Sequence, residues 1–142
     1  MNPELQPFVE AAAATLRDWA NVESLPAEAW TGPLPLAPCT FVVALELRRA
    51  APGTLWVALA PAVAAALAER VFAEVPKPDD PTLTADCVGE FANLIAGHAK
   101  ALLQGTPGHF LLGTPRLLES LPPLRATVRL ATEIGDVLIG LA

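Results

Sequence analysis

The stretch Asp86–Lys100, "DCVGEFANLIAGHAK", sets the architecture because it has the periodicity of a helix that packs on other elements. At about 100° per residue, its bulky apolar residues return to one side of the helix. Alanine and glycine residues form a second stripe, which lets a neighbouring helix or sheet approach closely. A third, narrow line holds nearly all of the polar side chains and one glycine, and it consists of Asp86, Glu90, Asn93, Gly97, Lys100 and Gln104.

The sequence on both sides of this stretch predicts a mixed fold. The periodic helix is expected over residues 80–104, because Gly105 and Pro107 stop it. The proline-rich residues 24–39 are expected to form a loop or an irregular edge. The other expected elements are helices over 3–20 and 61–73, a hairpin of strands over 40–49 and 54–60, and strands over 109–118, 124–132 and 136–142. Strands joined by hairpins favour an α+β fold in one domain, 1–142, with helices packed on one face of an antiparallel sheet.

Composition excludes several classes of protein. The chain of 142 residues is 53% hydrophobic and carries a net charge of −6, which argues against disorder and against binding to nucleic acid. Its longest uncharged apolar run has 14 residues, too few for a bilayer that requires about 20, so no membrane association is expected. The first residues lack a secretory signal pattern, and we expect a cytoplasmic protein.

The cysteines and histidines do not have the spacing of a metal site. Cys39 and Cys87 are far apart in the sequence and are interpreted as buried thiols. His98 falls on the apolar stripe, where a buried, hydrogen-bonded histidine is favoured over a catalytic one. His109 has no evident partner, so no metal ligands are predicted.

Glu90 and Asn93 are three residues apart on the polar line and can therefore point at one object. The helical pattern alone favours a solvent-exposed face without a specific function, and a functional surface is the alternative. A Glu-x-x-Asn pair arises by chance in many chains and decides nothing by itself.

The wider spacing resembles the signature of the CheC/CheX/FliY family of chemotaxis phosphatases, and CheX most closely. That signature is Asp or Ser, three residues, Glu, two residues and Asn, then a proline about twenty residues later. Here Asp86, Glu90 and Asn93 fit it, and Pro115 follows Asn93 after 21 intervening residues. The opening "NPELQPFVEAAAATL" and the later "GTPRLL" extend the resemblance over most of the chain.

The resemblance implies a phosphatase that acts on the aspartyl phosphate of a CheY-like response regulator. Asn93 would orient the attacking water, and Glu90 would pair with a lysine of the regulator. Asp86, Gly97 and Lys100 would form the rim, and the regulator would supply Mg²⁺, so that the chain needs no cofactor of its own.

The resemblance also implies a homodimer formed through sheet edges. The first helix has Ala13 three residues after Glu10, where a second motif would require Asn, so one centre per chain is predicted. An alternative function is an inactive dimerisation or adaptor domain that binds a regulator. A small-molecule binder is a third class, for which polar residues should line a cavity instead of a single stripe.

Overall fold

The computed structural model describes residues 3–30, 41–72, 81–118 and 126–142. The elements are α1 (Gln6–Ala20), β1 (Glu28–Ala29), β2 (Phe41–Arg48), β3 (Gly53–Leu59), α2 (Pro61–Val71), α3 (Pro81–Leu102), β4 (Leu111–Leu112), β5 (Arg116–Leu118), β6 (Ala126–Thr132) and β7 (Gly135–Leu141). Cys39, Asp80 and the first two residues of the strand expected at 124–132 lie outside the described residues. The predicted order of helix, two strands, two helices and three strands is found with two changes: β1 is added before the hairpin, and four strands follow α3.

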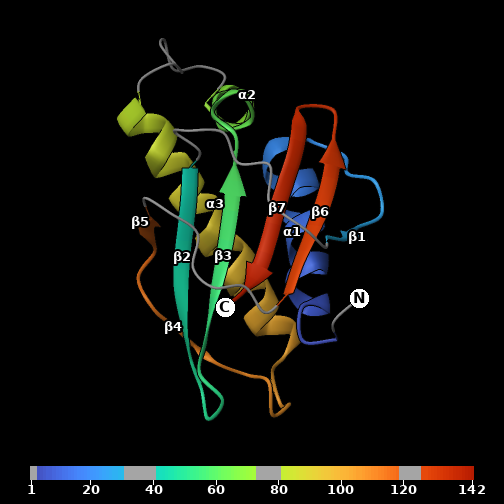
Figure 1. The fold of residues 1–142 in the computed structure, drawn as a ribbon, viewed down its shortest axis with the longest axis vertical. Coiled ribbons are helices and arrows are strands. Elements are labelled where there is room, and N and C mark those ends of the chain that lie inside the picture. Colours follow the sequence, from blue (N-terminus) through green and yellow to red (C-terminus); the bar gives the residue numbers. More distant parts are fainter. Residues whose placement is uncertain (1–2, 31–40, 73–80, 119–125) are drawn as a thin grey trace.

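The strands form one antiparallel sheet of seven strands in the order β1-β6-β7-β3-β2-β4, with β5 also paired to β2. The apolar strand expected over residues 136–142 is β7 (Gly135–Leu141). It pairs with β3 on one side and with β6 on the other, so it lies inside the sheet (Figure 1).

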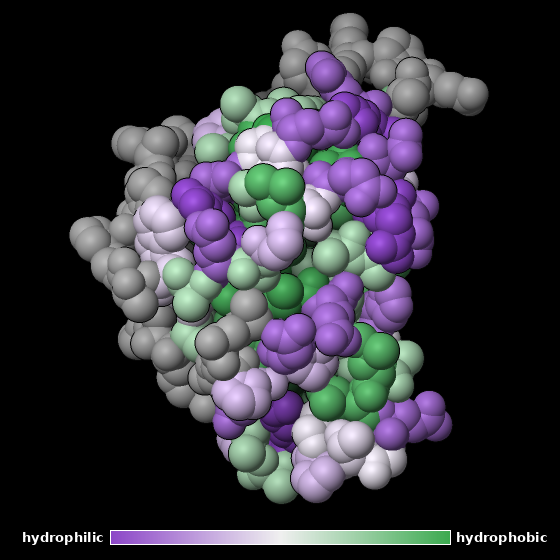
Figure 2. Space-filling view, turned by 90° about the vertical axis from the view of Figure 1, so that its right-hand side faces the viewer, coloured by the Kyte–Doolittle hydropathy of each residue, from purple (hydrophilic) through white to green (hydrophobic). Residues whose placement is uncertain are grey.

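Helices α1 and α3 lie on one face of this sheet, behind the strands in Figure 1, as the α+β prediction requires, and α2 is drawn end-on beyond the end of β3. The main core fills the space between the two layers, and β2, β3 and β7 contribute alternate residues to it, such as Leu45, Val57 and Ile139. This alternation is expected because successive side chains of a strand point to opposite faces. On the side where α1 and β6 lie, the hydrophobic surface is divided into separate patches by hydrophilic side chains (Figure 2).

A second, smaller cluster lies on the other face of the sheet and consists of Val42, Trp56, Ala58 and Leu138. The cross-strand partner of Trp56 is Gly140 on β7. A Cβ at position 140 would overlap the indole ring and would lie 2.6 Å from the carbonyl oxygen of Ala126. Glycine is therefore required there by close packing.

Two features of the sheet differ from the sequence prediction. The single strand expected over 109–118 is divided into β4 and β5. Between them the Gly113 N–H donates to the carbonyl of Glu46 at 3.0 Å, and Pro115 has no N–H to donate. The short β1 lies in residues 24–39, which were expected to form a loop or an irregular edge, and it pairs with β6 at the edge of the sheet. At this pairing the Arg129 guanidinium contacts the Glu28 carboxylate at 2.6 Å and lies over the Trp30 ring.

Candidate functional site on α3

The polar line of α3 faces solvent. Asp86 and Glu90 are exposed, whereas Asn93, Gly97 and Lys100 are partly exposed. The opposite side of the helix is buried and consists of Thr84, Cys87, Val88, Phe91, Ala92, Ile95, Ala96 and Ala99. The structure thus brings all five predicted site residues onto one accessible side of one helix.

The side chains of Glu90 and Asn93 are available to an external partner. Neither forms a hydrogen bond or an ion pair within the parts of the chain that the structure describes. A carboxylate can accept hydrogen bonds, and an amide can both donate and accept them. Their polar groups can therefore bind a water molecule or a second protein without first breaking an internal contact.

Close packing behind the polar line holds α3 in place. The Trp19 ring of α1 stacks on the Phe91 ring of α3, with centroids 6.1 Å apart and an interplanar angle of 8°. Ala92 and Ala96 are small and fully buried, which is consistent with the close approach predicted for the small stripe. A rigid support of this kind is needed where side chains must be aimed at a reacting group.

Two glycines of α3 are not required by internal packing. A Cβ built at Gly89 or at Gly97 would meet no other atom within 4 Å. A glycine within a helix costs about 1 kcal/mol relative to alanine. Gly97 therefore lowers the stability of the helix while leaving open space above the polar line.

A groove between α1 and α3 borders the same residues. It is shallow and open to solvent, with a volume of about 560 Å³, and it is lined by Ala14, Asp18 and Trp19 of α1 and by Asn93, Leu94 and Gly97 of α3, among others. Asn93 and Gly97 thus belong both to the polar line and to the groove. The sequence did not indicate the α1 side of this groove, because no spacing within the chain reports which face of α1 meets α3.

His98 corrects the sequence prediction. It was expected to be buried on the apolar stripe, but it is exposed and lines the groove. The most buried line of α3 runs between the bulky stripe and the small stripe. The alanines of the small stripe let neighbouring elements approach closely, so α3 is rotated towards them. The outer edge of the bulky stripe is therefore turned away from the core, and Leu94 beside His98 is only partly buried.

Cys87 is a buried free thiol, as the sequence predicted. Its burial, with a smaller effect of the negative charge of Glu90, raises the pKa of the thiol from 9.0 to about 11. A thiol with this pKa is almost entirely protonated at neutral pH and is a poor nucleophile. Covalent catalysis by Cys87 is therefore not indicated.

The described residues contain no group of three His, Cys, Asp or Glu side chains that could hold a metal ion. None of the helices in the same residues is long and apolar enough to cross a membrane.

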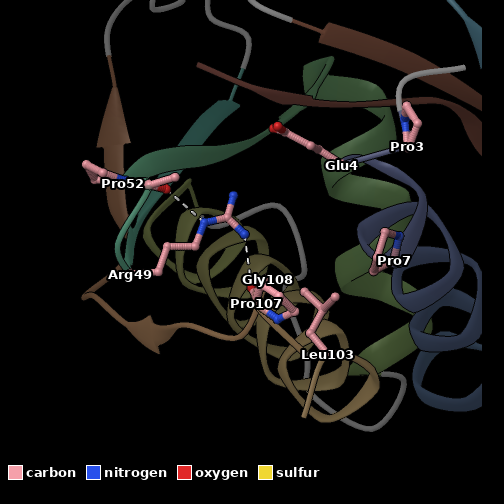
Figure 3. A pocket seen from close by; sticks show the side chains of 9 residues that line it. Pro3, Glu4, Pro7, Arg49, Pro52, Leu103, Pro107 and Gly108 are labelled. Carbon is pink, nitrogen blue, oxygen red and sulfur yellow. Dashed lines mark hydrogen bonds between the residues drawn. The ribbon is translucent and has the colours of Figure 1, made fainter. Parts of the chain in front are cut away.

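A second cavity, of about 270 Å³, lies at the C-terminal end of α3 (Figure 3). Arg49, at the β2–β3 turn, donates from Nε to the carbonyl of Ala51 and from Nη1 to the carbonyl of Gly108, each at 3.0 Å. The bond to Ala51 lies within the turn, and the bond to Gly108 ties the hairpin to the loop that follows α3. Because two guanidinium nitrogens are engaged by backbone carbonyls, this arginine has a structural role.

Comparison with protein-family models and with the sequences of curated proteins finds no match. Solved structures, by contrast, match over nearly the whole chain. A chemotaxis protein CheX from Desulfovibrio desulfuricans superposes with a TM-score of 0.80 at 19% identity, covering 99% of each chain. CheX in the CheX–CheY–BeF₃–Mg²⁺ complex from Borrelia burgdorferi gives 0.76 at 20% identity and 97% coverage of each chain.

FliY from Thermotoga maritima is also similar, with a TM-score of 0.66 at 18% identity, covering 98% of this chain and 90% of FliY. The similarity is thus one of fold over nearly the whole chain, at a sequence identity of 18–20%. The chain has the α+β fold shared by the CheX, CheC-like and FliY chemotaxis proteins.

Proposed function

We propose that this chain is a phosphatase that hydrolyses the aspartyl phosphate of a CheY-like response regulator in the cytoplasm. The observation that carries the proposal is the placement of Glu90 and Asn93. They stand three residues apart on an accessible helix, at the spacing of the CheC/CheX/FliY signature and within the fold of that family. In the Borrelia burgdorferi complex, the partner of CheX is CheY.

The chemistry requires little more than positioning. An acyl phosphate is already reactive, and catalysis of phosphoryl transfer rests on placing the nucleophile and stabilising charge. The Asn93 amide cannot act as a base at neutral pH, but it can hydrogen-bond a water molecule and aim it in line with the bond that breaks. Proton acceptance would fall to the phosphoryl group or to solvent.

Glu90 has a different role in the proposal. Its carboxylate pairs with a lysine ammonium of the regulator, and this charge-assisted contact fixes the docking register. Asp86 and Lys100, on either side along the line, form the rim, and Gly97 leaves room for the regulator's backbone. The Mg²⁺ that neutralises the phosphoryl charge is supplied by the regulator.

The test follows the loss of phosphate from a Mg²⁺-loaded, phosphorylated regulator with and without this protein. We expect the wild type to accelerate the loss, and Glu90→Ala and Asn93→Ala each to abolish most of the acceleration while thermal unfolding stays unchanged. Gln104→Ala, at an exposed position beyond the end of α3, is the matched control.

The adaptor function is an outcome of the same experiment. A regulator carrying BeF₃⁻ and Mg²⁺ as a phosphoryl analogue can be titrated with the wild type by calorimetry. Binding to the cognate regulator without any acceleration of hydrolysis would replace the phosphatase by a non-catalytic adaptor. The absence of both would refute the whole proposal.

A homodimer formed through a sheet edge is proposed as the assembly. Among the described strands, β4 and β5 border the sheet beside β2, and their side chains Leu111 and Leu117 are 60% and 57% exposed. An exposed apolar edge is a surface on which another chain can pair. We expect light scattering to give the mass of a dimer and Leu117→Lys to shift the protein towards monomer; a monomeric wild type at micromolar concentration would contradict this.

A further inference from the structure

The groove between α1 and α3 is continuous with the proposed catalytic line. Asn93 forms part of its wall, and Gly97 contributes no side chain to fill it. A protein that places a phosphoryl group beside Asn93 would therefore lie next to the groove.

The exposed lining of the groove is mainly apolar, although Asp18 and His98 also border it. Ala14 and Trp19 contribute apolar surface from α1, and Leu94 contributes it from α3. Trp19 is held by its stack on Phe91, so one wall is fixed before any partner arrives. Tryptophan is enriched among the few residues that carry most of the binding energy at protein interfaces.

We infer that this groove is a second docking site for the same regulator and takes an apolar side chain that flanks the phosphorylated aspartate. The inference rests on the proposed function. In this arrangement the two helices have different roles. Helix α3 supplies the groups that act on the phosphate, and α1 contributes to the affinity for one regulator over another. The selection acts through affinity because the α1 residues stand beside the reacting centre and not in it.

The inference is tested by filling or emptying the groove without touching Glu90 or Asn93. Ala14→Leu adds bulk from α1, and Leu94→Ala removes an apolar contact from α3. Ala13→Leu is the matched control: Ala13 is also partly buried, but it does not line the groove. Thermal unfolding of each variant shows whether it is folded.

We expect each groove variant to raise KM for the phosphorylated regulator, and the Kd for the BeF₃⁻-loaded form, by roughly tenfold, the loss typical of one well-packed contact. The kcat at saturating regulator should stay within twofold, and Ala13→Leu should behave as the wild type. Trp19 gives a second readout, since regulator binding should change the fluorescence of the wild type more than that of Trp19→Phe.

Failure of the inference is distinct from failure of the proposed function. An active wild type whose KM and Kd are unaltered in both groove variants would overturn the inference and leave the phosphatase intact. A fall in kcat with unchanged KM would also overturn it, since the groove would then act on catalysis and not on docking. A change in self-association without a change in regulator binding would assign the groove to a second copy of this chain.

Discussion

The substitution Gly97→Ala is expected to raise the stability of the protein and to lower its activity, so the two effects can be measured separately. A Cβ at position 97 meets no atom of the chain within 4 Å, so the substitution introduces no clash. Replacing glycine by alanine within a helix should then stabilise the protein by about 1 kcal/mol. For a chain of 142 residues this corresponds to a rise in Tm of about 3 °C. The same methyl group stands on the surface that receives the regulator, and should lower kcat/KM by roughly tenfold.

Calorimetric unfolding and regulator dephosphorylation measure the two effects on one preparation. Gly89→Ala is the control, because its Cβ also meets nothing and because Gly89 lies to the side of the polar line. It should give the same rise in Tm and keep its activity. A Gly97→Ala variant that is more stable and fully active would refute the claim that a partner approaches the helix closely at this position.

Two further substitutions test the packing of the sheet and the electrostatics beside Glu90. Gly140→Ala should destabilise the fold by roughly 1–3 kcal/mol, because the new methyl group overlaps the Trp56 ring; denaturant unfolding showing less than about 0.5 kcal/mol would contradict this packing. The raised pKa of Cys87 favours its neutral form in the folded state, so the stabilisation is complete below pH 9 and is lost as the pH rises towards 11, by about 2 kcal/mol. Cys87→Ala should lack this part of the alkaline loss, and identical pH profiles for the variant and the wild type would show that the thiol does not titrate this way.

The helical pattern of the central stretch was sufficient to predict α3 and its exposed line. Apolar residues recur at helical spacing there, and glycine and proline mark its end, so local signals agree with the final fold. The same holds for α2, which begins at the predicted Pro61 because proline is suited to the first turn. The hairpin of β6 and β7 is likewise local.

Features that depend on contacts between distant segments were not predictable. The exposure of His98 depends on the rotation of α3 about its own axis relative to its neighbours. The periodicity of the sequence does not fix this rotation more finely than the width of one stripe. The groove requires α1 and α3 to lie side by side, and the division of β4 from β5 depends on the bond from Gly113 to β2. The proposed catalytic role of Glu90 and Asn93 likewise depends on a second protein, which the sequence of this chain does not identify.

The most direct test of the account compares the binding and the rate of Asn93→Ala with those of the wild type on one regulator. If Asn93 aims the attacking water, the variant should bind the BeF₃⁻- and Mg²⁺-loaded regulator with nearly unchanged Kd, while the rate at saturation falls by at least about 100-fold. An Asn93→Ala variant that dephosphorylates the regulator as fast as the wild type would contradict the account.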